Sequence, residues 1–273
     1  MDRIQKALEK AKKQRQENIR QEEKLPDVED NKNIRVVEDI NYEQTQTISV
    51  SDESLRKNRV VSALKEDGRA DLFKILRTKI LQRMRANKSN VLAITSPTKG
   101  IGKSMVASNL AISIAMDVNY SVLLADLDLR RPRVHEYFDV KPEFGVRDYL
   151  ESDKAIADLL IHPGLESLVI LPAGKPIRRS SELLSTPKML ALASELKNRY
   201  PDRIVIIDLP PLLHTDDAMV VMPTVDACVL VVAEGETTEE DIVQSLRLID
   251  ETKLMGTILN KSADVQQSGY YYY

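Results

Sequence analysis

The feature that most constrains the fold of this chain is a glycine-containing turn that joins an apolar run to a helical pattern. The apolar run is Val91-Leu92-Ala93-Ile94, and the turn reads Ser96-Pro97-Thr98-Lys99-Gly100-Ile101-Gly102-Lys103-Ser104. A strand that passes through glycines into a helix turns several backbone N–H groups, and the positive end of the helix, toward one point. The pattern therefore predicts an α/β fold whose turn binds a phosphate group.

The residue types in this turn match separate tasks in phosphate binding. Lys103 is placed to reach the β- and γ-phosphates of a nucleotide, and Ser104 is placed to ligate Mg²⁺. The candidate nucleotide-binding residues are Gly100, Ile101, Gly102, Lys103, Ser104 and Met105. Pro97 stands where the common motif has its first glycine, so an ordinary glycine-rich turn is the alternative interpretation of this motif taken alone.

Two further apolar runs end in aspartates. One leads into Asp126-Leu127-Asp128 and the other into Asp208. Continuous apolar runs are typical of parallel strands buried on both faces, and ligands bind beyond the carboxyl ends of such strands. Because a buried aspartate must be paired or bind a metal, we expect these three carboxylates to meet Lys103 and Ser104 in one crevice. Taken singly, each aspartate is equally typical of a strand-end turn.

Length and composition fit one α/β domain with an appendage. The 273 residues carry a net charge of −3, which gives no reason to expect binding to nucleic acid. Cys228, the single cysteine, lies in an apolar run and is predicted to be a buried strand residue in a reducing compartment. No apolar stretch approaches the ~20 residues that span a bilayer, which predicts a cytoplasmic protein or one peripheral to a membrane.

Four regions are predicted along the chain: a charged helix at 1–24, a polar linker at 25–58, an α/β domain at 59–265 and a tyrosine-rich tail at 266–273. A helical pattern begins at Arg69. Its predicted core stripe consists of Leu72, Ile75, Leu76 and Ile80, and its charged face carries Asp71, Lys74 and Arg77. That charged face indicates either a solvated surface or a surface for self-association.

Strands and helices are predicted to alternate through the α/β domain. Strands are expected at 91–95, 121–126, 168–171, 203–208, 226–232 and 257–259, and helices after Gly102, within 146–160, after Thr186 and from about Asp216 and Glu239. Thr186-Pro187 supplies an N-cap and a first-turn proline for one of these helices. This alternation predicts a doubly wound, mostly parallel sheet, with a strand order that the pattern does not give.

The last four positions are all tyrosine: Tyr270, Tyr271, Tyr272 and Tyr273. Consecutive large side chains cannot share one face of a strand, and a terminus that follows glycine is usually mobile, so core packing explains them poorly. We interpret the cluster as a docking peptide or as phosphate acceptors that enter an active site. An incidental aromatic terminus is the alternative.

Together these motifs resemble those of the bacterial protein-tyrosine kinases that control capsular and exopolysaccharide synthesis, over roughly Arg69 to the tail. The family's Walker A motif is similar to 95–104, its second acidic motif to 123–132, which contains Asp-x-Asp-x-Arg-Arg-Pro, and its Walker B motif to 206–211. Residues 4–11 also resemble the start of the subgroup linked to exosortase-type loci. The resemblance implies a P-loop fold of the deviant Walker A (SIMIBI) type.

The resemblance also implies a role for each site residue, with ATP and Mg²⁺ as cofactors. Lys103 would hold the phosphates, while Ser104, Asp128 and Asp208 would bind Mg²⁺ directly or through water. Asp126 would orient or deprotonate the incoming tyrosine hydroxyl, so that the catalytic set is Lys103, Asp126, Asp128 and Asp208. The phosphate acceptors would be Tyr270 to Tyr273. Phosphoryl transfer needs positioning and charge neutralisation more than a covalent catalyst, and these residue types supply both.

Partners and location follow from the same resemblance. The family's oligomerisation motif, Glu-x-x-Arg-x-x-Arg, is matched by Asp71, Lys74 and Arg77, which implies a ring-like homo-oligomer that phosphorylates its tails in trans. The other implied partners are a membrane chain-length regulator that activates the kinase and a tyrosine phosphatase. The chain would then be cytoplasmic and peripheral at the inner membrane through that regulator.

Two other functions remain open from the sequence. A positioning or partition ATPase of the MinD/ParA type usually has a second lysine five residues before the Walker lysine, where this chain has Thr98. A non-catalytic nucleotide-binding scaffold would be expected to lack Asp126 or Asp128, and both are present. Ile101, Met105 and Leu209 also differ from the residues common in the kinase family, which leaves room for slow turnover.

Overall fold

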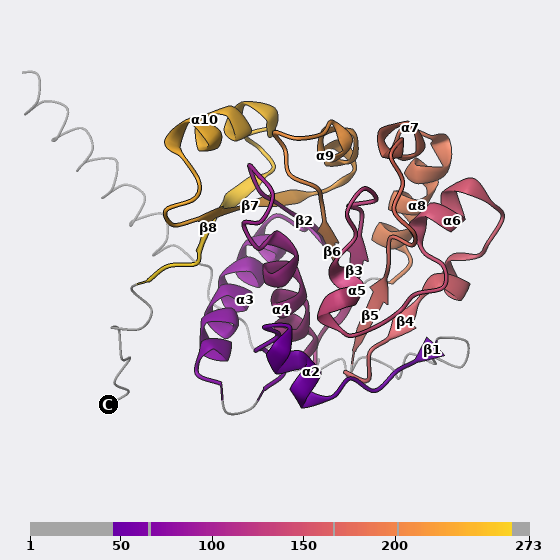
Figure 1. Ribbon diagram of the computed structural model, residues 1–273, viewed down its shortest axis with the longest axis horizontal. Coiled ribbons are helices and arrows are strands. Elements are labelled where there is room, and N and C mark those ends of the chain that lie inside the picture. Colours follow the sequence, from indigo (N-terminus) through magenta and orange to yellow (C-terminus); the bar gives the residue numbers. More distant parts are fainter. Residues whose placement is uncertain (1–45, 65–66, 166, 201, 264–273) are drawn as a thin grey trace, which may run out of the picture. The chain divides into compact units, whose positions relative to one another are not determined.

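The computed structural model describes residues 46–64, 67–165, 167–200 and 202–263, all of which belong to one compact unit of the chain (Figure 1). The predicted N-terminal helix at 1–24 and the tyrosine cluster at 270–273 lie outside the described residues. Among the helices of the described ranges, none combines the length and the apolar character needed to cross a bilayer.

The described residues form an eight-stranded sheet in the order β1-β4-β5-β3-β6-β2-β7-β8. The strands are β1 (Gln46–Thr47), β2 (Val91–Thr95), β3 (Ser121–Asp126), β4 (Ile161–His162), β5 (Leu168–Leu171), β6 (Arg203–Asp208), β7 (Ala227–Ala233) and β8 (Leu254–Asn260). All neighbouring pairs are parallel except β4 and β5. The predicted doubly wound, mostly parallel sheet is confirmed.

Burial explains why the central strands read as continuous apolar runs. Every residue of β2, β3, β6 and β7 is buried, as expected for parallel strands that are covered on both faces. Cys228 in β7 is fully buried, and burial raises its pKa to about 12, so its thiol is unreactive. β8 lies at the sheet edge, and its residues are partly buried or exposed, which is why the apolar pattern predicts only 257–259 of it.

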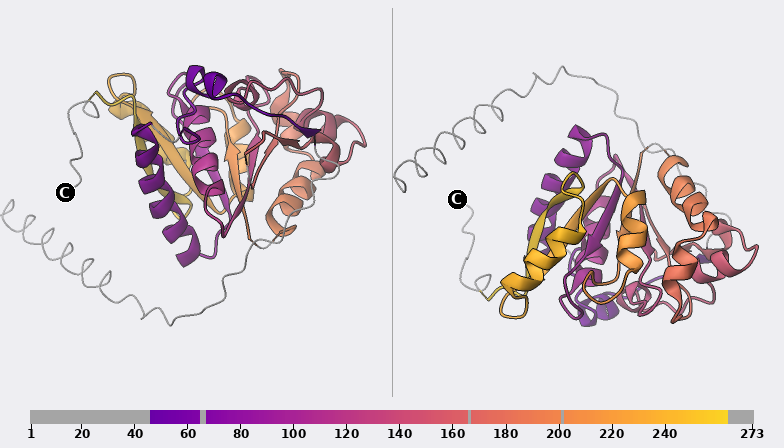
Figure 2. Two further views of the ribbon diagram at one scale, coloured as in Figure 1. Left: turned by 90° about the horizontal axis from the view of Figure 1, so that it is seen from below. Right: turned by 90° about the horizontal axis from the view of Figure 1, so that it is seen from above.

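Helices cover both faces of the sheet (Figure 2). They are α2 (Asp52–Lys57), α3 (Arg69–Ala86), α4 (Lys103–Ala115), α5 (Val134–Tyr137), α6 (Val146–Glu151), α7 (Ser180–Leu184), α8 (Pro187–Asn198), α9 (Asp217–Val221) and α10 (Glu239–Leu248), with 3₁₀ turns η1 (Ile156–Leu159) and η2 (Met222–Thr224). One core cluster joins α3 and α4 to Leu92 and Ile94 of β2. The other joins α8 and α9 to Val91 and Ala93 of the same strand. Alternate residues of one strand thus serve two cores.

The core stripe predicted for α3 is partly wrong. Ile80 is buried, but Leu72 and Ile75 are 40% and 46% exposed, and the helix instead buries Ala70, Leu81 and Met84. Arg77 also faces inward, where its guanidinium donates to the Ser113 carbonyl of α4 at 2.8 Å. α3 therefore presents an apolar strip away from its own core.

Residues 46–58, predicted to be the end of a linker, are part of the folded unit. They form β1 and α2, and Leu55 is buried in the first core cluster. The connection continues through the fully buried Asn109 of α4, whose side-chain oxygen accepts from the N–H groups of Val61 and Ser62. Its amide nitrogen donates to the Arg59 carbonyl. Asn109 therefore fastens residues 59–62 to the helix that follows the glycine-containing turn.

Candidate active site

The acidic strand ends meet at one edge of the sheet, as predicted. β3 and β6 are neighbours, and their register places Asp126 opposite Asp208. β2, which leads into the glycine-containing turn, lies on the other side of β6. A cavity of about 680 Å³ opens here, lined by Lys99, Gly100, Gly102, Lys103, Ser104, Asp128, Arg130, Arg131, Arg133, Tyr137, Pro210, Pro211, His214 and Thr215.

The glycine-containing turn adopts the conformation that anion binding needs. Gly100 and Gly102 have φ values of 83° and 96°, a region that side chains disfavour. α4 begins at Lys103 with no side-chain cap and no acidic residue in its first turn, so its N-terminal N–H groups remain available to an anion. Of the six predicted nucleotide-binding residues, Ile101 and Met105 turn their side chains toward the core instead.

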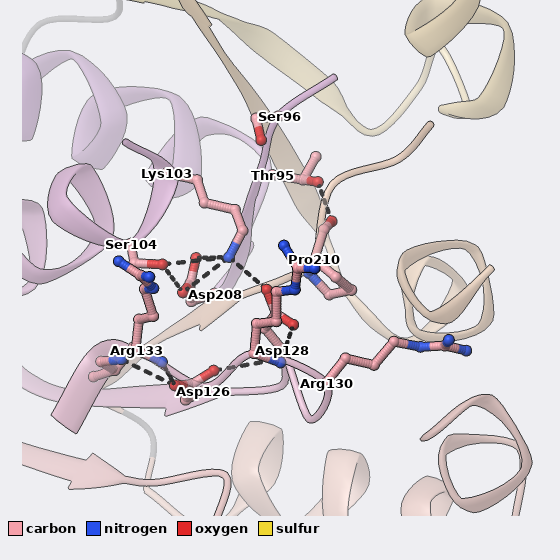
Figure 3. Close-up of polar contacts among 12 residues, drawn as sticks. Thr95, Ser96, Lys103, Ser104, Asp126, Asp128, Arg130, Arg133, Asp208 and Pro210 are labelled. Carbon is pink, nitrogen blue, oxygen red and sulfur yellow. Dashed lines mark hydrogen bonds and ion pairs between the residues drawn. The ribbon is translucent and has the colours of Figure 1, made fainter. Parts of the chain in front are cut away.

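Lys103 lies at the centre of the polar cluster (Figure 3). Its Nζ is 3.0 Å from Asp128 Oδ2 and 3.4 Å from Asp208 Oδ2. Ser104 Oγ donates to the same Asp208 oxygen at 2.5 Å. The structure thus brings together four of the five predicted polar residues within bonding distance, although they come from three separate segments of the chain.

Asp126 is the fifth, and its contacts are different. It is fully buried, and one oxygen accepts from the N–H of Asp128 while the other accepts from the N–H groups of Arg133 and Val134, at 2.9–3.1 Å. Both oxygens therefore hold the loop that follows β3. Asp126 does not line the cavity, in contrast to Asp128.

The protonation of the cluster reflects the concentration of buried carboxylates. Burial and the nearby Asp208 charge raise the pKa of Asp126 to about 7. Burial also raises the pKa of Asp208, although Lys103 and Ser104 oppose the shift. Burial alone would lower the pKa of Lys103, but Asp208 and Asp128 raise it above its usual value, so Lys103 stays charged. One lysine faces three carboxylates, which is an arrangement suited to a further cation.

The oxygen donors of this cluster fit a Mg²⁺ ion that is also bound by phosphate and water. They do not fit a metal ion that only protein side chains would hold. Carboxylate and hydroxyl oxygens are the ligands that Mg²⁺ accepts, usually through one or two protein groups together with phosphate oxygens and water. Across the described ranges, no three His, Cys, Asp or Glu side chains are grouped to hold a metal by themselves. Ser104, Asp128 and Asp208 thus fit an ion that arrives with a nucleotide.

Asn260, at the end of β8, is a site residue that sequence reasoning missed. Its Nδ2 donates to the Ile101 carbonyl at 2.7 Å, and a Cβ on Gly102 would lie only 2.3 Å from that nitrogen. Asn260 therefore supports the glycine-containing turn from the far end of the chain. The signal available was its position, a polar residue directly after an apolar run, as with the aspartates.

Arg130 is a second missed residue, and it connects the cavity to α7 and α9. Its Nε donates to Ser180 Oγ at 2.8 Å and to Asp217 Oδ2 at 3.1 Å. Ser180 and Asp217 are both fully buried, and they also bond to each other. The guanidinium of Arg130 is thus fixed at the cavity rim by a buried carboxylate.

Comparison with known proteins agrees with this geometry. CapB of Staphylococcus aureus, assigned as a tyrosine-protein kinase, is 30% identical over 206 residues, which are 75% of this chain and 89% of CapB. The tyrosine-protein kinase YwqD of Bacillus subtilis is 29% identical over 80% of this chain and 92% of its own. The chain belongs to the bacterial tyrosine-protein kinases. No model of a protein family matches it.

Solved structures support the same assignment. The kinase domain of the Escherichia coli tyrosine kinase Etk superposes with a TM-score of 0.69 at 30% identity, covering 84% of this chain and 92% of that domain. Against full-length Etk, the chain spans only 28% of the relative's length. The septum site-determining protein MinD of Pyrococcus horikoshii has a TM-score of 0.51 at 24% identity, with 62% of this chain covered, which shows a shared fold.

Proposed function

We propose that this tyrosine kinase is an ATP-dependent autokinase that phosphorylates its own cluster Tyr270–Tyr273 and thereby regulates exopolysaccharide or capsule synthesis. The observation that carries the proposal is the contact of Lys103 with Asp128 and Asp208 beside Ser104, at the mouth of a cavity bordered by the glycine-containing turn. Cations, carboxylates and a hydroxyl around an anion-binding turn are what phosphoryl transfer requires.

Each residue of the cluster would have a defined task. ATP would supply the phosphoryl group, and the Mg²⁺ ion bound with it would supply positive charge beside the carboxylates. Lys103 would stabilise charge on the phosphates, and Asp208 would orient both Lys103 and the Ser104 hydroxyl. Asp128, which lines the cavity, is better placed than Asp126 to meet an incoming hydroxyl. We therefore assign Asp126 to fixing the loop that carries Asp128.

We also propose self-association through α3. Asp71 and Lys74 pair with each other at 2.8 Å on the exposed side of the helix, beside the exposed side chains of Leu72 and Ile75. A surface that combines apolar side chains with charges fits a protein partner. Leu72→Glu with Ile75→Glu should lower the mass seen in sedimentation, with Leu190→Glu on α8 as the control. An unchanged mass would contradict the proposal.

We also propose two protein partners: a membrane chain-length regulator that activates the kinase, and a tyrosine phosphatase. The regulator would hold the kinase at the inner membrane. A solved relative is the chimeric protein CapA2B2, which superposes with a TM-score of 0.68 at 28% identity. Supplying the cytoplasmic segment of the regulator from the same bacterium should raise the rate of tail phosphorylation. An unchanged rate at saturating segment would count against that partner.

The kinase function is tested by mass spectrometry of the purified chain after incubation with ATP and Mg²⁺. Phosphates should be found on Tyr270 to Tyr273 and should be absent from Lys103→Met and from a variant in which all four tyrosines are phenylalanine. ATP hydrolysis without phosphotyrosine, even with the regulator segment present, would instead favour a switch ATPase of the MinD type. Nucleotide binding without either reaction would favour a scaffold.

A further inference from the structure

Carboxylates outnumber the cation at Lys103, but the lining of the cavity as a whole has more cationic than acidic side chains. Five cationic residues line it, Lys99, Lys103, Arg130, Arg131 and Arg133, against Asp128 as the acidic residue of the lining. Lys103 is matched by Asp128 and Asp208, and Arg130 is matched by Asp217. Within the described ranges, Arg131 makes no ion pair, and Arg133 reaches only Glu136 at 3.9 Å between two exposed side chains.

The loop that bears the arginines is held rigidly. The N–H of Arg131 donates to Asp128 Oδ1 at 3.0 Å, and the N–H of Arg133 donates to Asp126 Oδ2 at 2.9 Å. Arg130 is fixed at its other end by Ser180 and Asp217. Figure 3 shows Arg130 and Arg133 leaving this loop in different directions, on either side of Asp128. Because the backbone is fixed beforehand, an anion bound here has to order the side chains of Arg131 and Arg133 but not the loop that carries them.

The nucleotide does not account for this arginine wall, which we define as Arg131 and Arg133 together with the fixed Arg130. The glycine-containing turn, the N-terminus of α4 and Lys103 already provide a site for the nucleotide phosphates. The remaining positive charge is then available to the other proposed reactant, the tyrosine acceptor. Arginine binds phosphate through a planar fork, which makes it more selective for phosphate than a lysine would be.

The proposed acceptor changes its charge as it reacts. Residues 264–273 contain one acidic side chain, Asp264, and the four tyrosines are neutral before modification. A phosphotyrosine brings about −1.5 to −2 charges and three acceptor oxygens. In an extended segment, residues two apart lie on the same side at a spacing of about 7 Å, so one tyrosine can enter the site while a modified neighbour rests against the wall.

We propose that the arginine wall is a phosphotyrosine subsite that holds a modified tyrosine of the cluster while a neighbouring tyrosine is phosphorylated. The inference rests on the proposed autokinase function. The transfer itself is unchanged: the tyrosine oxygen bonds to the γ-phosphorus, the bond from that phosphorus to the bridging oxygen breaks, ADP leaves, and the hydroxyl proton is released. The subsite changes the rate of transfer: once a tail carries its first phosphate, its neighbouring tyrosines are phosphorylated faster.

The test uses peptides of residues 262–273 in which Tyr270 is the single acceptor and positions 271 and 273 are phenylalanine. Position 272 is phosphotyrosine in one peptide and phenylalanine in the other. With the full chain, kcat/KM should be about 10-fold higher for the phosphotyrosine peptide, since a surface that is mainly of one charge sign concentrates an opposite charge by about that factor. In Arg131→Gln with Arg133→Gln the ratio should fall toward 1, whereas Arg247→Gln, a surface arginine of α10, should keep it.

Binding measured by fluorescence anisotropy of the same peptides, labelled at the N-terminus, separates two kinds of failure. Equal kcat/KM and equal binding of the two peptides would overturn the subsite and leave the kinase function intact. An equal loss of both peptides' rates in the double arginine variant would mean that the arginines serve the nucleotide, which also overturns it. Transfer neither to the peptides nor to the chain's own tail would refute the kinase function, while tighter binding of the phosphotyrosine peptide, lost in the double variant, would still support the subsite.

Discussion

At the amino end of the sheet, Asp226 accepts from the N–H groups of Asn90 and Val91, both at 3.1 Å, and pairs with Lys197. At the carboxyl end, Asp208 shares Lys103 with Asp128 and stands close to Asp126. Burial acts on both ends, but at Asp226 these donors outweigh it and the pKa is lowered, whereas at Asp208 and Asp126 the pKa is raised.

The difference shows that the charged group at the amino end of the sheet stabilises the folded state, whereas the cluster at the carboxyl end destabilises it. A carboxylate with a full set of donors favours the folded state. Three carboxylates around one lysine disfavour it until a ligand supplies more positive charge. Because the two groups lie at opposite ends of one sheet, substitutions at the two ends should have opposite consequences for activity and for stability.

The largest expected effect is on activity at the carboxyl end. Asp208→Asn should reduce phosphoryl transfer at least ~100-fold, because it removes the group that orients Lys103 and Ser104. The free energy of unfolding in EDTA at pH 8 should not fall, since one buried negative charge is gone. Single-turnover transfer and urea denaturation measure the two quantities. A loss of stability above ~1 kcal/mol would contradict the comparison.

The matched change at the amino end should do the reverse. Asp226→Asn should lower the free energy of unfolding at pH 7 by about 2 kcal/mol, because a charged acceptor is lost, and should leave transfer within about twofold. The pKa of Asp226 is lowered, so its contribution is present above the usual 3.8 and is lost as the pH falls through the folded-state value. The stability gap between wild type and variant should therefore narrow below pH 3.8.

Asn260 refines the comparison between the two ends of the sheet, because it supports the glycine-containing turn at the carboxyl end through an uncharged side chain. Asn260→Ala removes the hydrogen bond to the Ile101 carbonyl and should weaken ADP binding about 10-fold, or about 1.4 kcal/mol. Titration calorimetry measures the affinity. Asn198→Ala, which removes an exposed amide on α8, is the control. Unchanged ADP affinity in Asn260→Ala would show that the turn keeps its shape unaided.

The smallest expected effect is on how the free energy of unfolding changes with pH. Since the pKa of Asp126 is raised to about 7, its contribution to stability is present at low pH and is lost as the pH rises through 7. Wild type should lose about 1 kcal/mol between pH 6 and pH 8 from this group, and Asp126→Asn should lack that part of the slope. Parallel slopes in urea denaturation would mean that the three backbone donors keep Asp126 ionised throughout.

The parts of the fold that the sequence predicts are those whose signals are local. Four or five aliphatic residues in a row mark β2, β3, β6 and β7, and Thr186 caps α8 through a bond to the Met189 N–H. The meeting of Lys103 with the aspartates is predictable because parallel strands end at one edge. Each of these inferences needs no knowledge of distant partners.

The parts that could not be predicted depend on distant partners. α3 carries two apolar strips, and packing against α4 decides which one is buried, so the periodicity of this segment alone predicts burial of the exposed Leu72 and Ile75. Residues 59–62 are held by Asn109, a polar residue nearly fifty positions away, and apolar periodicity cannot reveal such a contact. Arg130 likewise meets Asp217 across 87 positions.

The burial of Leu55 from α2 in the first core cluster has a practical meaning for anyone who expresses this protein in pieces. A fragment that starts at residue 59, the domain boundary expected from composition, would discard α2 and leave a gap where the buried Leu55 side chain belongs. Because Leu55 belongs to the same core cluster as α4, the helix that starts at Lys103, such a fragment would give misleadingly low rates. A fragment that starts at residue 46 keeps β1, α2 and the buried Leu55 side chain.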